Sequence, residues 1–274
     1  WTVCLYSVTE AVRQVTDDFG WPSLQVAEET VLPLGALAFT GKKFQDIRTA
    51  ISRAGKGGIA AEWITYRTAP LSIRDQIEAI SEEWVSDKAL PEMGFTLGGL
   101  DELEDPTVRC LIAVDAERTV HGVTSWMPCY SEGEPIGWTL DFMRRRTGTE
   151  VAGFKGVMEF LIGTAALDLQ AQGAQFLSLS GAPLAQAHPD EDQAGVQRLL
   201  QVVGGTMEPV YGFRSLLRFK AKFQPEYRPM YLCYPEAAAL PRIGLAISRA
   251  YLPNMTVRQV VRMLCVGLIH GDLS

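Results

Sequence analysis

The stretch that most constrains the fold covers residues 137–159. It begins with an apolar segment, residues 138–143, which predicts a buried strand that carries one acid, Asp141. Three arginines follow, then a loop with two glycines, and from about Lys155 the spacing of apolar residues predicts a helix. An acid in a strand, bases directly behind it and a loop that opens a helix together predict a binding edge.

The pattern around this stretch predicts strands before it and alternating helices and strands after it. Strands at residues 108–114, 120–127 and 137–143 are joined by short connections, which predicts an antiparallel meander. The helix continues to about residue 172. Beyond it we expect a buried strand, two helices and a short strand, at residues 176–179, 192–203, 211–223 and 230–234. The last forty residues are expected to be helical.

The chain before the meander predicts a second set of elements. Three helices and two strands are expected there, with helices at 7–19, from 40 to about 54 and at 71–85, and strands at 31–39 and 59–66. A length of 274 residues fits two modest domains. We place the boundaries so that the domains are residues 1–88, residues 89–235 and a helical tail, residues 236–274.

The acidic net charge of −7 does not suggest a general nucleic-acid binder, but the basic residues are clustered. Three basic islands lie at residues 42–56, 144–155 and 214–228. Together they could form one patch for phosphate groups, whereas each one alone is typical of a solvated face.

Other residue patterns exclude several classes of protein. No apolar run reaches the roughly 18 residues that a membrane span needs. Because the chain opens on Trp1 rather than Met, we expect an excised piece whose missing amino-terminal part could be membranous. Five scattered cysteines predict reduced thiols in a cytosolic setting, and three distant histidines do not predict a metal site.

The order of meander, helix, strand, helix and strand is similar to that of the acetyltransferase-like (GNAT) fold. In that fold a loop written Arg/Gln-x-x-Gly-x-Gly/Ala holds the pyrophosphate of coenzyme A with backbone N–H groups at a helix start. The same place here carries Arg145-Arg-Thr-Gly148-Thr-Glu150, and the carboxylate of Glu150 would repel an anion. We therefore expect the fold without coenzyme A, and no other cofactor.

The candidate catalytic residues are Asp141 and Arg144. The sequence has no Gly-x-Ser-x-Gly motif and no Cys or Ser with an evident His partner, which favours direct transfer between two bound substrates. A carboxylate at the strand end could hold an amine while the guanidinium meets a carbonyl or phosphate. The alternative is an internal ion pair that only fixes the loop. Glu159 faces either the same cleft or solvent, and His188 is typical of a surface histidine.

Several longer blocks make a resemblance specific. They occur in the order Met93-Gly-Phe-Thr-Leu-Gly98, Leu140-Asp-Phe-Met-Arg144, Gly156-Val-Met-Glu-Phe-Leu-Ile162, Leu179-Ser-Gly-Ala-Pro-Leu-Ala185 and Leu217-Arg-Phe-Lys-Ala-Lys-Phe-Gln-Pro-Glu-Tyr-Arg-Pro-Met-Tyr-Leu-Cys-Tyr-Pro235. The blocks resemble the carboxy-terminal cytosolic domain of the aminoacyl-phosphatidylglycerol synthases, the multiple peptide resistance factor family. Residues 41–48 resemble the amino-terminal helix of the same family, so that the match covers residues 35–235.

The resemblance implies a tandem acetyltransferase-like α+β fold, with two mixed sheets flanked by helices and a tunnel between the halves. It also implies transfer of an aminoacyl group from aminoacyl-tRNA to a hydroxyl of an anionic membrane lipid, phosphatidylglycerol, without coenzyme A. Asp141 and Arg144 would contribute to the aminoacyl site. The substrate-binding residues would be Glu159, Ser180, Arg218, Lys220 and Lys222. The tRNA-binding residues would be Lys42, Lys43, Arg48, Arg145 and Arg146.

The chain departs from the family in two places, and it leaves alternatives open. Ser52 stands where the family would have Asn, and residues 240–274 are longer and more apolar than expected. Tail helices at 243–252 and 257–269 would lie either on an anionic leaflet or in the core. On the family reading, the chain is the cytoplasmic domain of a bacterial inner-membrane protein. The rivals are a transferase that acts on a peptidoglycan precursor, a non-catalytic membrane-associated module and a coenzyme A acetyltransferase.

Overall fold

A computed structural model describes residues 2–86, 94–95, 98–147, 154–183 and 213–251. Its strands are β1 Leu5–Val8, β2 Ser23–Pro33, β3 Ala60–Ile64, β4 Arg109–Val114, β5 Val120–Ser131, β6 Glu134–Arg145, β7 Phe176–Pro183 and β8 Glu226–Cys233. Its helices are α1 Glu10–Asp18, α2 Gln45–Lys56, α3 Leu71–Ser86, α4 Val157–Ala171, α6 Phe213–Ala221 and α7 Leu240–Tyr251. None of the helices in these ranges is both long and apolar enough to cross a membrane.

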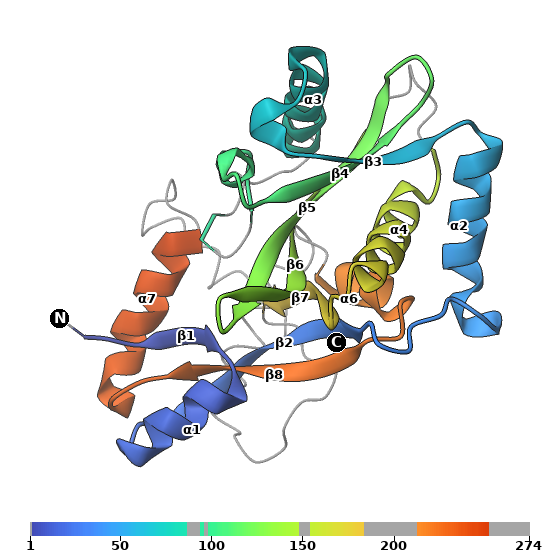
Figure 1. Cartoon of the computed structure of the whole chain (residues 1–274). Helices are drawn as coiled ribbons and strands as arrows, with labels where there is room; N and C mark the ends of the chain where they lie inside the picture. The colour runs from blue at the N-terminus through green and yellow to red at the C-terminus, as the bar shows by residue number, and fades with distance from the viewer. Residues whose placement is uncertain (1, 87–93, 96–97, 148–153, 184–212, 252–274) are drawn as a thin grey trace, which may run out of the picture.

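The described strands form one eight-stranded sheet in the order β1-β8-β2-β7-β6-β5-β4-β3 (Figure 1). Neighbouring strands in this sheet are antiparallel except β6 and β7, which are parallel and joined through α4. The expected α+β class, a mixed sheet flanked by helices, is therefore confirmed, and so is the meander β4-β5-β6. Where two sheets were expected, the strands join into one, because β2 of the first half pairs with both β7 and β8 of the second.

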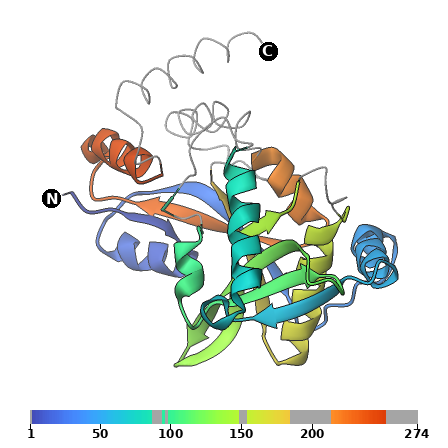
Figure 2. The ribbon, with the colours of Figure 1, turned by 90° about the horizontal axis from the view of Figure 1, so that it is seen from above.

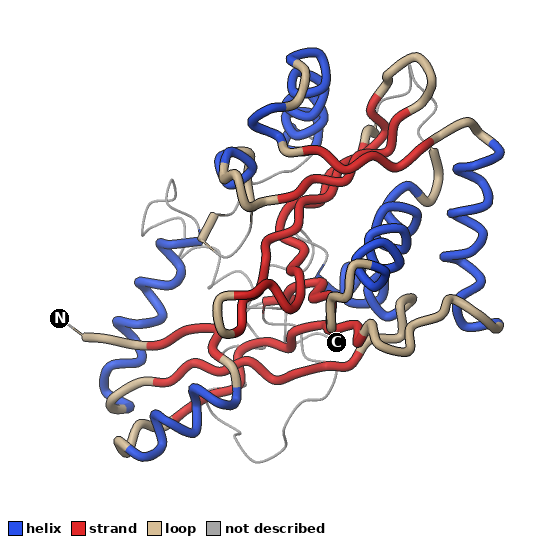
Figure 3. Tube along the Cα trace, viewed as in Figure 1, coloured by secondary structure: helices blue, strands red, loops and turns tan. Residues whose placement is uncertain are grey.

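Helices cover both faces of this sheet, as the views in Figures 2 and 3 show. One core lies between the sheet and the helices α2 and α4, and its members include Ile47, Trp126 and Leu161. A second core lies under α3 and includes Ile77 and Phe142. A smaller third core joins α7 to β2 and β8. Strand β6 contributes side chains to the first two cores, so changes in its register move residues from one face to the other.

The element boundaries differ from the sequence prediction in informative places. Residues 7–8 belong to β1, and the helix predicted at 7–19 begins only at Glu10. The strand predicted at 31–39 begins earlier, as β2, and runs through two acids, Glu28 and Glu29. The connection predicted at 128–135 is a two-residue turn in which Glu132 and Gly133 have φ of 51° and 85°. Two positive φ angles match the twist of a tight hairpin, and so β5 and β6 extend further than predicted. The helices predicted at 192–203 and 257–269 lie outside the described residues.

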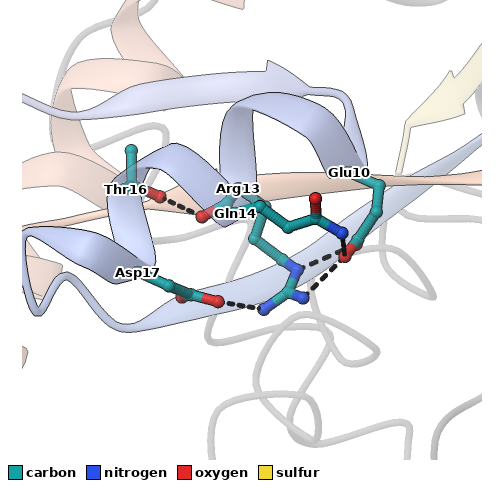
Figure 4. Close-up of polar contacts among 5 residues, drawn as sticks. All are labelled: Glu10, Arg13, Gln14, Thr16 and Asp17. Carbon is teal, nitrogen blue, oxygen red and sulfur yellow. Dashed lines mark hydrogen bonds and ion pairs between the residues drawn. The ribbon is translucent and has the colours of Figure 1, made fainter.

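Helix α1 packs against the sheet through its polar side. Arg13 donates to Glu10 and Asp17 on the same helix (Figure 4), and its guanidinium lies over the ring of Tyr231 in β8, 5.3 Å from the ring centroid. The apolar residues of this segment, Val12, Val15 and Phe19, are instead exposed. The usual orientation of an amphipathic surface helix is therefore reversed in α1.

Candidate functional site

A bulge in β6 decides which face of the sheet carries Asp141. Strand β6 pairs with β5 at Met143 and again at Leu140, but the partners on β5, Thr124 and Trp126, are only two residues apart. Residues three apart in a regular strand point to opposite faces, and one inserted residue returns them to the same face. The backbone N–H of Phe142 in the bulge donates to the buried hydroxyl of Ser125, 3.0 Å away. Asp141 and Arg144 thus share the face covered by α3.

The carboxylate of Asp141 lies directly against Gly98. A Cβ added at Gly98 would overlap all three atoms of this carboxyl group, so a side chain at this position would have to displace the carboxylate. Burial raises the pKa of Asp141 and nearby Glu102 raises it further, whereas Arg144 and the backbone N–H of Gly98 oppose both effects. Within the described ranges, the buried Oδ2 of Asp141 has no hydrogen-bond partner. The carboxylate is thus held in place with one oxygen left to bind another group.

The guanidinium of Arg144 is stacked on aromatic rings. Its central carbon lies 3.7 Å from the centroid of the Trp84 ring on α3 and 4.7 Å from that of Phe142. One terminal nitrogen also donates to the carbonyl of Met143, 3.0 Å away. A guanidinium stacked on a ring has its N–H donors in its own plane, a geometry that suits a carbonyl or phosphate oxygen. Sequence reasoning missed Trp84, because it continues the apolar face of α3 and looks like a core residue.

The strands β6 and β7 are paired for only part of their length. Their hydrogen-bonded register runs from Gly137 with Phe176 to Thr139 with Ser178. One residue further along β6, the hydroxyl of Ser180 donates to the carbonyl of Leu140 in place of a backbone group. Ser180 has a φ of 62°, which few residues other than glycine adopt. This end of the strand pair, next to Asp141, is named the fork below.

A buried lysine reaches the fork from α6. The Lys220 side chain is 3% exposed, and its Nζ donates to the carbonyls of Ser180 and Gly181, at 3.0 and 3.3 Å. Burial lowers the pKa of Lys220 to about 7, against the opposing charge of Glu29. Glu29 in turn accepts from Ser178, 2.6 Å away. The fork therefore contains an amine that is neutral in a large fraction of molecules near neutral pH.

The other predicted substrate-binding residues lie in different surroundings. Lys222, after α6, donates to Glu159 on α4 at 2.7 Å and lies 3.6 Å from Asp46 on α2. The hydrogen bond with Glu159 raises the pKa of Lys222. This ion-pair network ties three helical segments together, and Arg218 on α6 is exposed. Of the five predicted residues, the structure brings only Ser180 and Lys220 into direct contact at the fork.

The predicted tRNA-binding residues divide into exposed and internally bonded groups. Lys42, Lys43 and Arg145 are exposed. Arg48 donates to the carbonyls of the preceding loop, at Phe39 and Gly41, and to Gln45. Arg146 donates to the carbonyl of Val120 and, at 3.5 Å, to Gln76. Arg48 and Arg146 therefore brace local structure. His188 and the loop residues 148–150 lie outside the described residues.

The described residues hold no group of three or more His, Cys, Asp or Glu side chains placed to bind a metal ion. Within those residues, the candidate site consists of a carboxylate and a stacked guanidinium on β6, and a buried amine and two serines at the fork. Such a set can bind an ammonium group, polarise a carbonyl and accept a proton.

Comparison with known families and sequences gives a consistent result. A family model described as phosphatidylglycerol lysyltransferase, C-terminal, matches residues 1–234. An uncharacterized protein of Corynebacterium glutamicum is 46% identical over 252 residues, which cover 92% of this chain and 31% of that protein. A phosphatidylglycerol lysyltransferase of Bacillus subtilis is 27% identical over 243 residues, which cover 87% of this chain and 27% of that protein. The chain thus spans less than a third of the length of these relatives.

Two solved structures share the fold over most of this chain. The structure of L-PGS from Bacillus licheniformis has a TM-score of 0.73 at 23% identity, covering 91% of this chain and 73% of that one. The carboxy-terminal domain of a putative lysylphosphatidylglycerol synthetase from Agrobacterium fabrum also has a TM-score of 0.73, at 20% identity, covering 93% and 74%. At these identities the likeness concerns the fold.

Proposed function

Because the chain belongs to the family described as phosphatidylglycerol lysyltransferase, C-terminal, we propose that it transfers an aminoacyl group to a membrane lipid. The donor is aminoacyl-tRNA, and the acceptor is a hydroxyl of phosphatidylglycerol. The chain would act as the cytoplasmic domain of a bacterial inner-membrane protein, without coenzyme A. The division into halves at residue 88 and a tunnel between them are part of the same proposal.

The observation that carries the proposal is the chemistry assembled at the fork. An aminoacyl ester is already activated, so that its transfer needs alignment, a proton acceptor and a stabilised oxyanion rather than a protein nucleophile. Lys220, with a pKa of about 7, suits the proton acceptor. Two hydrogen bonds of Ser180 connect Lys220 with Leu140, the residue before Asp141. The carbonyl of Ser180 accepts from Lys220, and its hydroxyl donates to the carbonyl of Leu140.

The transfer conserves all atoms in one exchange of esters. The lipid hydroxyl oxygen attacks the aminoacyl carbonyl carbon and forms the new ester bond while its proton passes to neutral Lys220. The bond between that carbon and the ribose oxygen of the tRNA then breaks, and Lys220 returns the proton to the ribose oxygen. The products are an aminoacyl lipid and a free tRNA, and no oxidant or further reactant is required.

Asp141 and Arg144 bind the aminoacyl group in this proposal. The free Oδ2 of Asp141 accepts from the ammonium of the amino acid. The stacked guanidinium of Arg144 donates to the carbonyl oxygen, on which negative charge develops during attack. Exposed Lys42, Lys43 and Arg145 are the described candidates for contacts with tRNA phosphates, which an acidic chain of this kind would make only locally.

Incubation of the chain with radiolabelled aminoacyl-tRNA and phosphatidylglycerol vesicles tests the proposal. Lysine and alanine should be compared as the aminoacyl group. Label should become chloroform-extractable, and mild alkali should release it because the product is an ester. We expect Asp141→Ala and Arg144→Ala each to lower the rate by at least about tenfold, and Arg67→Ala, at an exposed arginine outside the basic islands, to leave it within about twofold.

The same assay separates the rival functions. Label that never enters the organic phase, but appears in a peptidoglycan precursor as an alkali-stable amide, would assign the chain to that rival reaction. Equal rates of transfer for wild type, Asp141→Ala and Arg144→Ala would show that the assigned residues are wrong although the proposed reaction is right. A rise in melting temperature with acetyl-coenzyme A, without transfer to lipid, would favour the acetyltransferase.

A further inference from the structure

Three aromatic rings from distant parts of the chain meet near the site. Tyr6 of β1, Phe95 of the segment after α3 and Tyr251 at the end of α7 contact one another. The rings of Tyr6 and Phe95 are stacked, with centroids 5.9 Å apart and planes 27° apart. The two tyrosine hydroxyls share a hydrogen bond of 3.1 Å. We name these three residues the aromatic platform.

Phe95 is the exposed member of the platform. It is 58% exposed, whereas Tyr251 is 7% exposed and Tyr6 is partly buried. Phe95 also has a φ of 71°, a conformation that is costly for a bulky side chain. Two largely covered tyrosines thus support a strained phenylalanine whose ring faces solvent. Burial of apolar surface does not explain a large apolar ring in that position, because most of the ring remains in contact with solvent.

Chain connectivity places the platform beside the candidate site. Gly94, next to Phe95, donates its backbone N–H to the carbonyl of Tyr251 at 3.1 Å, which fixes this end of the segment. Gly98, three residues after Phe95, packs against the carboxylate of Asp141. Three residues span at most about 11 Å. The Cα atom of Phe95 therefore lies within about 11 Å of that of Gly98, which itself packs against the carboxylate that would bind the aminoacyl moiety.

We propose that Phe95 stacks on the terminal adenine of the aminoacyl-tRNA. This inference rests on the proposed function, because it assigns a subsite to that donor. The aminoacyl ester and the adenine are carried by the same ribose, so a site that holds the ester near Asp141 brings the base within reach of the platform. A flat, supported ring suits base stacking, and the paired hydroxyls of Tyr6 and Tyr251 suit a polar nucleoside better than an acyl chain.

Steady-state kinetics of the full chain with two donors test this inference. The first donor is aminoacyl-tRNA and the second is an aminoacyl ethyl ester, which has no base. Phe95→Leu keeps an apolar side chain but removes the stacking surface, and we expect it to raise KM for aminoacyl-tRNA by about tenfold. KM for the ethyl ester and for phosphatidylglycerol should stay within about twofold. Phe95→Trp, which retains a stacking ring, should keep the wild-type KM for aminoacyl-tRNA.

Two controls separate stacking from stability and from a lipid contact. Phe19→Leu removes an exposed ring on α1 and should change none of these constants. Melting temperatures of all variants should agree within a few degrees, and if Phe95→Leu does not fold, Phe95→Asn, which tolerates a positive φ, takes its place. An equal KM for aminoacyl-tRNA in Phe95→Leu and wild type would overturn the inference. A rise in KM for phosphatidylglycerol instead would show that the aromatic platform contacts the lipid, and this result would also overturn the inference.

Direct binding keeps this inference distinct from the proposed function. An uncharged CCA trinucleotide should bind the wild type and Phe95→Trp about equally, and bind Phe95→Leu about tenfold more weakly. If wild type transfers no aminoacyl group but this difference is seen, the proposed function fails and the adenine subsite stands. If wild type transfers the group and the trinucleotide binds all three proteins alike, the subsite fails and the function stands.

Discussion

Gly98 is the position at which the candidate site most narrowly restricts the type of residue. We predict that Gly98→Ala lowers the transfer rate by at least about tenfold, because the added Cβ must displace the Asp141 carboxylate. Gly35→Ala is the matched control, since an added Cβ there meets no atom within 4 Å. Kinetics and melting temperatures of both variants provide the measurement. An active Gly98→Ala with unchanged stability would show that Asp141 is not confined as described.

Lys220 predicts an unusual dependence of stability on pH. Its folded-state pKa of about 7 lies below the value of about 10.4 for an unfolded lysine, so the unfolded state binds more protons between these values. Stability therefore rises with pH through this window. Relative to Lys220→Met, wild type should gain roughly 2 to 3 kcal/mol between pH 6 and pH 9. Urea unfolding at both pH values measures the difference.

The proposed role of Lys220 as proton acceptor makes a separate prediction. Lys220→Met should abolish most transfer at every pH, because methionine accepts no proton. In wild type, the rate should rise through about pH 7 as Lys220 loses its proton. A flat rate profile in this range, together with the expected change in stability, would leave Lys220 buried but not catalytic.

Sequence reasoning singled out Asp141, Arg144, Ser180 and Lys220, and the structure places the first two on one face of β6 and the last two in contact at the fork. It selected them as charged or polar residues in motif blocks. It missed Trp84 and Ser125, because an aromatic on the apolar face of a helix and a serine within a strand look like ordinary members of those elements. Their contacts with Arg144 and the β6 bulge arise only when α3 and β5 pack beside β6.

The bulge is the feature of β6 on which the site depends. We predict that Ser125→Ala destabilises the fold by about 1 to 3 kcal/mol, because the buried N–H of Phe142 loses its acceptor. The transfer rate should fall as well, since a repaired register would turn Asp141 away from Arg144. Ser131→Ala, at the exposed end of the same strand, should change neither quantity. Thermal unfolding and rate measurements on both variants test the prediction.

The reversed orientation of α1 predicts which of its positions tolerate polar substitutions. Val15→Gln and Phe19→Gln should change the free energy of unfolding by less than about 0.5 kcal/mol, because both side chains are already exposed. Thr16→Asp should cost about 2 kcal/mol or more, because it places a charge at a buried position beside Asp17. Chemical denaturation of the three variants gives the comparison. Equal costs at positions 15 and 16 would contradict the reversed packing.

At the scale of elements, hydrophobic periodicity predicted the meander and the helices α2, α3 and α4 well. It placed β2 too late, because Glu28 and Glu29 interrupt the apolar pattern that signals a strand. Glu28 is buried and Glu29 accepts from Ser178 across the strand pair, so tertiary partners compensate for acids that local propensity disfavours. The local sequence of a strand does not indicate partners that lie more than a hundred residues away in the chain.

At the scale of the whole molecule, the single sheet predicts that the two sequence halves depend on each other. Expressed separately, residues 1–88 and 89–274 should each lack a cooperative unfolding transition, because β2 supplies a neighbour to both β7 and β8. Mixing the two pieces should restore one transition near the melting temperature of the intact chain. Cooperative unfolding of residues 89–274 alone would instead support an independent second half.

The central position of β2 also imposes an order on synthesis. Its first residue, Ser23, pairs with Cys233, and its last, Pro33, pairs with Phe176. A ribosome adds roughly 5 to 20 residues per second, so β2 waits on the order of 10 to 40 seconds before its second neighbour has been made. Both edges of β2 stay unpaired until β7 has been made, and one edge stays unpaired until β8 follows. The nascent chain is therefore a natural client for holding chaperones, and its yield should depend on translation speed downstream of β2.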